Sequence, residues 1–441
     1  MADTIFALSS GPAPSGLAVI RVSGPASAAV FHALTGRGAP PPPRVATLCL
    51  FRNPVDGVAL DQGIALWFPG PHSFTGEDVL EIQGHGGAAT IATILSALGR
   101  IDGCRLADPG EFSRRAFANG RLDLNEVEAL SDLIQAETEA QRRMALRLAS
   151  GAGSERYKDW TDRLMRLLAT LEAAVDFPED DLPETMLDRN EIDIRRLVSE
   201  FSQDIDIGSL SDAVRHGVRI AIVGAPNVGK STLLNHLSGR EAALVSDIAG
   251  TTRDVVEVRL DLGGYLATVG DTAGLRDSVD SIERAGIDKA IRTAASADLI
   301  LHLFDGTEAP ILPDVLAERR DDILCVRTKT DLGPVAPKGL SNDEIAISCH
   351  TGRGIDRLLD RLRGACEERY GAALSAVAVR SRHRDALSRA RDALERSLVS
   401  PEFAMAAEEV RLALGEIGRI TGRVDVEAVL DIVFSEFCIG K

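Results

Sequence analysis

The sequence predicts a multidomain protein that combines α/β parts with an all-α part, and three observations lead to this prediction. The chain has 441 residues, which is too long for one hydrophobic core and favours about two to four domains. An apolar strand, a glycine-rich loop and a helix follow one another at residues 218–237. Hydrophobic residues recur at helical spacing on both sides of that segment. We therefore expect a nucleotide-binding α/β domain inserted into a helical domain, with a further domain at the N-terminus.

Residues 1–120 predict a mixed α/β domain. Strand-like apolar runs occupy residues 5–8, 16–22, 64–68 and 78–82, and helical spacing occupies residues 27–34 and 88–98. Arg21 and Glu81 are charged residues inside two of these strands. Both side chains need a partner there, and either an ion pair between them or a hydrogen-bonded ligand satisfies the need.

Residues 121–214 and 371–441 predict long helices. Val127, Leu130 and Leu133 recur at helical spacing in the first segment, and Leu387 and Leu394 lie on such a pattern in the second. The simplest interpretation is one helical domain assembled from both segments. The domain at residues 215–370 is then an insertion.

Composition narrows the class of protein. The formal net charge is −17, which argues against indiscriminate binding to nucleic acid and requires a local basic patch for any RNA partner. The six cysteines include no C-x-x-C pair, so no zinc or disulfide framework is indicated. No apolar run is long enough to span a membrane, and the N-terminus lacks the features of a signal or transit peptide. We expect a cytoplasmic protein without membrane contact.

Residues 224–231 have the pattern G-x-x-x-x-G-K-S of a phosphate-binding loop. Two glycines let the backbone N–H groups approach a polyphosphate, Lys230 reaches the terminal phosphates, and the Ser231 hydroxyl binds Mg²⁺. The alternative, an ordinary glycine-rich turn, does not account for the strand before the loop and the helix after it. The residues expected to contact the nucleotide are Asn227, Val228, Gly229, Lys230, Ser231 and Thr232.

Two further segments fit the same site. Thr252 is expected to complete the Mg²⁺ shell, and the residues before it line the nucleotide as well: Ser246, Asp247, Ile248, Ala249, Gly250 and Thr251. A hairpin turning at Gly263 and Gly264 leads to the second segment, which comprises Asp271, Thr272, Ala273 and Gly274. Asp271 suits a water-mediated Mg²⁺ contact, and the Gly274 N–H can face the γ-phosphate.

The base is expected to be guanine. The carboxylate of Asp331, in the sequence Thr328, Lys329, Thr330, Asp331, can accept hydrogen bonds from the ring N–H and the exocyclic amine of guanine. The first position of this motif is usually Asn, so Thr328 predicts a weaker hold on the base. Ser348, Cys349 and His350 take the place of the second base-contacting loop. Cys349 and His350 can also be interpreted as a catalytic or metal-binding pair.

Leu275 follows Gly274, where Ras-like GTPases carry a glutamine that orients the attacking water. A leucine cannot orient water, so another residue must do so in this Ras-like P-loop GTPase domain. Glu283 is the best candidate in the acidic stretch that follows. Its alternative interpretation is a solvated glutamate at the start of a helix.

The chain resembles the MnmE (TrmE) family of tRNA modification GTPases over nearly its whole length. Besides the nucleotide motifs, the resemblance depends on residues 20–24 (IRVSG), 73–87 (SFTGEDVLEIQGHGG), 109–112 (PGEF), 117–124 (FANGRLDL) and 438–441 (CIGK). It implies an N-terminal domain that forms a homodimer and binds 5-formyl- or methylene-tetrahydrofolate. It also implies a heterotetramer with a FAD-containing MnmG/GidA-type partner. Together the two proteins would build an aminomethyl-type group on the wobble uridine of certain tRNAs.

The same resemblance implies roles for individual residues. Folate contacts correspond to Arg21, Glu81, Arg121 and Lys441, although the family usually has Lys at the position of Arg121. Glu283 corresponds to the glutamate that orients water, and Cys438 is placed near the folate. The resemblance also implies a K⁺ ion that activates hydrolysis, held by Asn227, Ser246, Ile248 and Thr251.

A different class of protein stays open at this stage. A GTP-gated switch in ribosome assembly, which binds rRNA without modifying it, shares the nucleotide motifs but needs neither the first 120 residues nor the C-terminal tetrapeptide. The arginine-rich run at residues 380–391 is either a tRNA contact or a solvated helix face. For Cys438, a frayed tail with a buried thiol is the alternative interpretation.

Overall fold

The structure is a computed structural model. It describes residues 3–176, 184–240, 242–244, 257–271, 294–305, 319–332, 344–423, 433–434, 437 and 440, with the side chains of 184–188 and 271 excepted. The chain divides into two compact units. Unit 1 comprises residues 1–131, 148–165 and 414–441, and unit 2 comprises residues 132–147 and 166–413. None of the helices within the described residues combines the length and apolar character that a membrane span requires.

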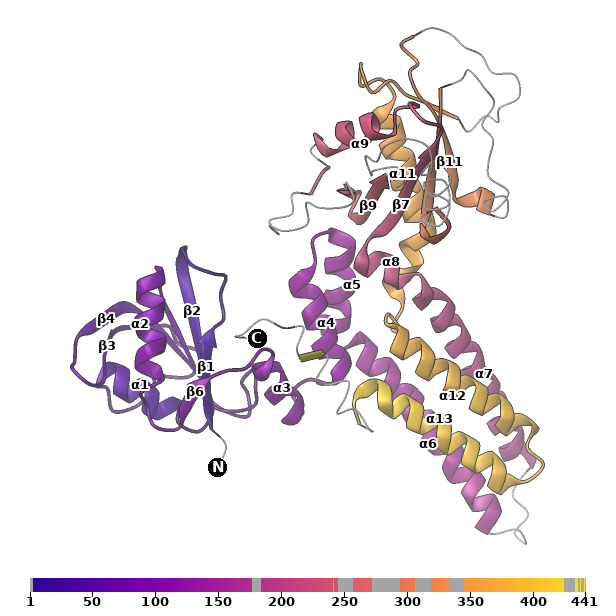
Figure 1. Ribbon diagram of the computed structural model, residues 1–441. Helices are drawn as coiled ribbons and strands as arrows, with labels where there is room; N and C mark the ends of the chain where they lie inside the picture. Colours follow the sequence, from indigo (N-terminus) through magenta and orange to yellow (C-terminus); the bar gives the residue numbers. More distant parts are fainter. Residues whose placement is uncertain are drawn as a thin grey trace, which may run out of the picture. The chain divides into compact units, whose positions relative to one another are not determined.

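The N-terminal part of unit 1 is a mixed α/β fold, as predicted. Its six-stranded sheet has the order β3-β4-β5-β2-β1-β6, in which β1 and β6 are parallel and the other neighbours antiparallel. Helices α1 and α2 lie against this sheet (Figure 1). The elements are β1 Thr4–Leu8, β2 Ser15–Ser23, α1 Ser27–Thr35, β3 Thr47–Arg52, β4 Ala59–Phe68, β5 Val79–Gly86, α2 Ala88–Leu98, β6 Cys104–Leu106 and α3 Glu111–Ala118.

The two faces of this sheet bury different side chains. One face packs against α1 and α2 in a core that includes Phe31, Phe51 and Leu80. On the other face, Ile5 and Ala7 pack with Phe112 of α3 in a smaller cluster. Strand β3 was not predicted from the sequence. Its apolar residues lie on both faces, with Leu48 and Leu50 exposed and Cys49 and Phe51 buried, so the usual alternation of apolar and polar residues is missing.

The C-terminal end of the chain packs on the segment that follows this sheet. Val433, Phe434 and Phe437 share a buried cluster with Leu124 and Val127 of α4. Gly110 has a φ of +68°, and a Cβ there would lie 2.5 Å from the carbonyl oxygen of Phe434, a position that only glycine fits. Residues far apart in the sequence therefore form one core in unit 1, to which α4 Leu124–Gln135 contributes. Helix α6 Ala152–Asp176 follows later in the chain.

The helices of unit 2 come from both flanks of the nucleotide-binding segment. Helix α7 packs along α12 (Figure 1). Arg380, just before α12, donates to Asp132 of α4 at 2.9 Å, and Arg411 of α13 pairs with Glu172 of α6 at 2.7 Å. Segments from the two flanks thus contact one another, while the domain boundaries given above stay predictions. Helices α7 Glu184–Ser209, α8 Ser211–His216 and α12 Ser381–Val399 lie wholly in unit 2, whereas α5 Glu139–Ala149 and α13 Phe403–Thr421 end in unit 1.

The second sheet lies in unit 2 and has the order β12-β11-β10-β7-β9-β8. All neighbouring strands are parallel except β8 and β9, which form the hairpin predicted at Gly263 and Gly264. Every residue of β10 is buried, as expected for a central strand covered on both faces. The elements are β7 Val218–Gly224, α9 Lys230–Ser238, β8 Glu257–Leu262, β9 Tyr265–Asp271, β10 Leu299–Phe304, β11 Ile323–Arg327, β12 Ile345–Ala346, α11 Ile355–Tyr370 and the 3₁₀ helix η2 Gly371–Ser375.

The β8–β9 hairpin is bonded to the start of α5. The Ala140 N–H donates to the carbonyl oxygen of Gly264 at 2.9 Å, which satisfies one of the free N–H groups at a helix N-terminus. Arg259 of β8 donates to Glu137, just before α5, at 2.7 Å. The nucleotide-binding sheet and the helical segment before it are therefore joined through this hairpin.

Candidate nucleotide-binding site

The phosphate-binding loop begins where β7 ends, between its parallel neighbours β9 and β10. Gly224 has a φ of +154°, and a Cβ there would lie 2.4 Å from the carbonyl oxygen of Leu303 on β10. Gly229 has a φ of +107° and stands directly before α9. Both glycines of the sequence motif are therefore required by the backbone, one for contact with β10 and one for the turn into the helix.

Lys230 is ordered over this loop. Its Nζ donates to the carbonyl oxygens of Gly224 and Ala225 at 2.8 and 2.9 Å. Asn227 holds a φ of +61°, a conformation that asparagine tolerates better than most residues. Ser231 and Thr232 lie in the first turn of α9, where the N–H groups and the helix dipole favour a bound anion. The loop is arranged to receive a polyphosphate.

Thr328 joins the base-binding loop to the phosphate-binding loop. It is buried, and its Oγ1 donates to the carbonyl oxygen of Val228 at 2.6 Å. Its N–H donates to the carbonyl oxygen of Phe304, at the end of β10, at 2.8 Å. The hydroxyl that replaces the usual amide thus fixes the two loops to each other, a role that the sequence did not reveal.

We expect Thr328→Val to weaken GDP binding about 5- to 30-fold. The substitution keeps the side-chain shape but leaves the buried Val228 carbonyl oxygen without this donor, which costs about 1–2 kcal/mol. A titration with a fluorescent GDP analogue measures the change, and Thr328→Ser, which retains the hydroxyl, is the matched control. Wild-type affinity in Thr328→Val would show that the bond does not support the site.

The residues expected to contact the base lie on two adjoining loops. The Thr330 N–H donates to the carbonyl oxygen of Ile347 at 3.3 Å, so residues 328–331 lie beside residues 348–350. A hydrogen bond from Ser348 lowers the pKa of the exposed Asp331 below its usual value. Asp331 is therefore an anionic acceptor at neutral pH. Lys329 has a φ of +56°, and its Nζ lies 3.5 Å from Asp305.

The second interpretation of Cys349 and His350 finds no support in the structure. Burial, together with the negative charge of Asp331, raises the pKa of the Cys349 thiol, so the thiol stays protonated at neutral pH and is a poor nucleophile. Within the ranges that the structure describes, no group of three or more His, Cys, Asp or Glu side chains is arranged to hold a metal ion. The pair is placed instead next to the base-binding loop.

Arg21 and Glu81 pair with each other across β2 and β5. They are directly opposite in the register, and Arg21 Nε and Nη2 each lie 3.0 Å from Glu81 Oε1. The guanidinium also lies over the rings of Phe74 and Phe112, with Cζ 5.1 and 5.7 Å from the ring centroids. Of the two possibilities left by the sequence, the ion pair is present, so a ligand here would meet a charge pair already held in place.

Gly440, near the C-terminus, contacts the same sheet. Ser9 Oγ donates to the carbonyl oxygen of Gly440 at 2.8 Å. Gly440 has a φ of +104°, and a Cβ there would lie 2.0 Å from the carbonyl oxygen of Leu8. Leu8 follows Ala7, which pairs with Arg21 in the register of β1 and β2. Gly440 is therefore held at the end of β1, beside Leu8, which is one residue along the strand from the partner of Arg21.

Arg121 lies beside the loop that precedes β5. A Cβ at Gly76 would lie 3.2 Å from Arg121 Cγ, and Asn119 Nδ2 donates to the carbonyl oxygen of Thr75 at 2.7 Å. Arg121 is exposed. Its long cationic side chain is thus available at this loop for an anionic group of a ligand.

Several expected site residues lie outside the described part of the chain or are described only in part. Asp271 is described by its backbone alone, which ends β9 opposite Ile222 of β7, close to the phosphate-binding loop. The residues outside the described ranges are Ser246, Asp247, Ile248, Ala249, Gly250, Thr251, Thr252, Thr272, Ala273, Gly274, Glu283, Cys438 and Lys441. Their roles stay predictions.

The arginine-rich run at the start of α12 makes ion pairs within unit 2. Arg380 pairs with Asp132 at 2.9 Å, and Arg384 pairs with Asp212 at 2.5 Å. Both guanidinium groups are mostly buried, with 15% and 16% of the side chain exposed. These two arginines hold helices together, which the sequence did not predict because their partners are 248 and 172 positions away.

This chain is similar to known proteins over its whole length. Residues 4–121 match the family model described as GTP-binding protein TrmE N-terminus, and residues 124–438 match the MnmE helical domain. The chain is 49% identical over 444 residues to the tRNA modification GTPase MnmE of Parvibaculum lavamentivorans, with 100% of both chains covered. It is 47% identical over 444 residues to the protein of the same name in Paramagnetospirillum magneticum, again with 100% of both covered.

One solved structure with similarity to this chain is that of Era in complex with MgGDPNP and nucleotides of 16S ribosomal RNA. It is 26% identical, covers 33% of this chain and 56% of its own, and has a TM-score of 0.26. A similarity at this score adds nothing to the assignment.

Proposed function

Because this chain belongs to the MnmE family of tRNA modification GTPases, we propose that it is a K⁺-activated GTPase acting on the wobble uridine of certain tRNAs. GTP is hydrolysed to GDP and phosphate, and C5 of the uridine is modified together with a FAD-dependent MnmG/GidA-type partner. The observation that carries the proposal is the phosphate-binding loop with Lys230 ordered over it and joined to the base-binding loop through Thr328.

The residues around this loop fit GTP with Mg²⁺. Lys230 and the N-terminus of α9 supply positive charge for the β- and γ-phosphates, and Asp331 supplies the anionic acceptor for guanine. Ser231 and Thr252 would hold the Mg²⁺ ion, which neutralises phosphate charge when bound. In hydrolysis a water attacks the γ-phosphorus in line with the departing GDP oxygen.

We expect GTP turnover to be much faster in KCl than in NaCl, by about 10-fold or more. The family implies a K⁺ ion held by Asn227, Ser246, Ile248 and Thr251, and such a charge would stabilise the developing negative charge on the phosphates, where removing one stabilising group costs about 10²–10³ in rate. Steady-state phosphate release in matched concentrations of the two salts measures the ratio. Equal and slow turnover in both salts would remove the cation from the mechanism.

We expect Glu283→Ala to bind GTP normally but to hydrolyse it about 100-fold more slowly. Leu275 stands where a water-orienting glutamine is usual, so Glu283 is assigned the positioning of the water. Single-turnover hydrolysis with separate measurement of GTP affinity distinguishes the two effects. Asp277→Ala and Asp280→Ala are the controls, because each removes a neighbouring charge of the same acidic stretch. Turnover that falls equally in all three variants would contradict the assignment.

The N-terminal domain is assigned the folate and the dimer contact. Arg21, Glu81, Arg121 and Lys441 would hold 5-formyl- or methylene-tetrahydrofolate, and Cys438 is placed beside it. The ordered Arg21–Glu81 pair, with the tail fixed at Leu8 and Ser9, supports this placement. Gly440 lies at the end of β1, and the folate is assigned to the same end of this strand. We further propose a homodimer through this domain and a cytoplasmic location.

Mass spectrometry of tRNA nucleosides from cells lacking this protein tests the proposal. The modified wobble uridine is expected to disappear and to return when the gene is restored, because the protein is proposed to act in building the group at C5. Unchanged wobble nucleosides with a defect in ribosomal subunits would favour the GTP-gated ribosome-assembly switch instead.

A further inference from the structure

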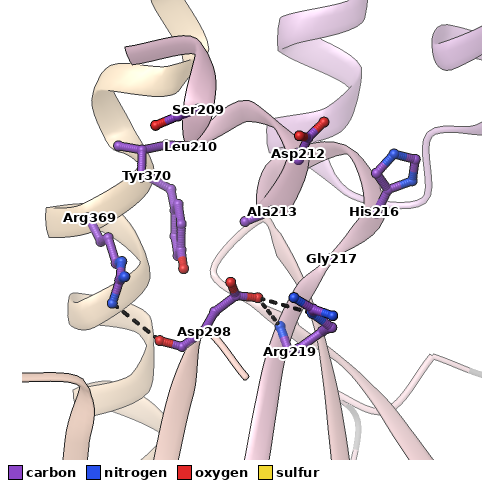
Figure 2. A pocket seen from close by; sticks show the side chains of 10 residues that line it. All are labelled: Ser209, Leu210, Asp212, Ala213, His216, Gly217, Arg219, Asp298, Arg369 and Tyr370. Carbon is purple, nitrogen blue, oxygen red and sulfur yellow. Dashed lines mark hydrogen bonds and ion pairs between the residues drawn. The ribbon is translucent and has the colours of Figure 1, made fainter. Parts of the chain in front are cut away.

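A cavity of about 520 Å³ lies where the chain passes between the helices and the nucleotide-binding sheet (Figure 2). Residues 209–217 lead from α7 through α8 to β7 and form one side, and the end of α11 with the start of β10 forms the other. All of these residues belong to unit 2. The volume is in the range of pockets for small molecules, roughly 300–1,000 Å³.

Tyr370 lines this cavity, and its buried hydroxyl has no hydrogen-bond partner among the described residues. Only 1% of Tyr370 is exposed, and no donor or acceptor among the residues of the described chain bonds its hydroxyl. Figure 2 shows the hydroxyl directed into the space that the Asp298 carboxylate also faces. Buried polar atoms are almost always bonded, so this hydroxyl marks a position for a ligand atom or a water.

Asp298 presents a fixed acceptor near that hydroxyl. Its Oδ2 accepts from the Arg219 N–H at 2.8 Å and lies 3.7 Å from Arg219 Nε. Its carbonyl oxygen accepts from Arg369 Nη1 at 3.2 Å. Because these bonds hold Asp298 at both backbone and side chain, its carboxylate is a preorganised acceptor beside the Tyr370 donor.

The charges around the cavity are already paired. Asp212 pairs with Arg384 at 2.5 Å, Asp298 with Arg219, and Arg369 with Asp322. Burial and the neighbouring Arg215 lower the pKa of His216 below 6.5, so this ring is neutral at pH 7. A charged ligand would compete with these pairs for its counter-charge. An uncharged ligand leaves all of them in place.

We propose that this cavity binds an uncharged small molecule containing a cyclic amide, whose carbonyl oxygen accepts from Tyr370 and whose N–H donates to Asp298. A ring fixes the amide in the cis form, which places the donor and the acceptor side by side. Leu210 and Ala213 supply apolar parts of the cavity wall. The site does not depend on the function proposed above. It is formed where the chain enters the sheet, at residues 209–217, and where it leaves the sheet, at the end of α11, and not by the nucleotide loops.

Saturation-transfer NMR on the full chain, with GDP in excess to fill the nucleotide site, tests the proposal with 2-pyridone as the probe. We expect transfer to 2-pyridone at millimolar concentration and little transfer to 1-methyl-2-pyridone, which lacks the N–H. Tyr370→Phe, which removes only the hydroxyl, is expected to weaken binding at least about 5-fold. Ala213→Leu, which places a larger side chain in the cavity wall, is expected to weaken binding.

Three results would overturn the proposal. The first is no transfer to 2-pyridone in the wild-type protein, and the second is equal transfer in Tyr370→Phe. The third is a crystal soaked with 2-pyridone whose cavity contains water alone. The thermal midpoint of Tyr370→Phe checks the folding of the variant, and it is expected to be equal to or above the wild-type value because an unbonded buried hydroxyl has been removed.

Discussion

A Lys230→Ala protein is expected to lose GTP hydrolysis by about 100-fold or more, because a preorganised positive group at the phosphates is removed. In the structure Lys230 Nζ is held by two carbonyl oxygens of the loop, at 2.8 and 2.9 Å. Those bonds place the ammonium group where the terminal phosphates are expected. Nucleotide affinity should fall as well, since the contact exists before the transition state is reached.

The measurement is phosphate release under saturating GTP, with affinity determined separately. Lys158→Ala is a matched control, since it removes an exposed lysine of α6 that is remote in sequence from the nucleotide motifs. Circular dichroism establishes that both variants are folded. Hydrolysis within a factor of about two of the wild type, a change below about 0.5 kcal/mol, would exclude Lys230 from phosphate stabilisation.

Gly440→Ala is expected to abolish folate binding and wobble modification while GTP hydrolysis continues. Alanine is strained at a φ of +104°, and its Cβ would lie 2.0 Å from the Leu8 carbonyl oxygen. The tail must leave this position, which also breaks the bond from Ser9 to Gly440. Under the function proposed above, the folate contacts assigned to Lys441 and Cys438 are then lost, whereas the nucleotide loops belong to a different unit and are untouched.

Equilibrium binding of 5-formyltetrahydrofolate and nucleoside analysis of tRNA measure the two losses. Gly415→Ala is the control, because a Cβ at this glycine of α13 meets no atom within 4 Å. Full folate affinity in Gly440→Ala would separate the tail from the folate site. A parallel loss of GTP hydrolysis would contradict the assignment of the two activities to different parts of the chain.

The local patterns of the sequence predicted the elements well. Strands β2 and β5 alternate buried and less buried residues over part of their length, and residues 218–238 combine an apolar run with glycine positions, all of which are patterns of nearby residues. Gly224 and Gly229 were predicted as part of a motif, and the structure gives each a separate backbone reason.

The contacts that complete the sites could not be predicted in this way. Ser9 and Gly440 are 431 positions apart, and Thr328 and Val228 are 100 positions apart. No local pattern encodes such pairs, because they depend on how the sheet edges and loops come together. Thr328 was expected only to weaken the hold on the base. The bond from its hydroxyl shows that it also fixes the phosphate-binding loop.

The β8–β9 hairpin lies in the chain between the two segments expected to sense the γ-phosphate, residues 246–252 and 271–274. Its turn accepts a hydrogen bond from the start of α5 at Gly264, and Arg259 pairs with Glu137 just before that helix. A chemical change at the phosphates that displaces either strand would therefore shift α5 with it. The hairpin is therefore a direct hydrogen-bonded connection from the nucleotide-binding sheet to the start of α5.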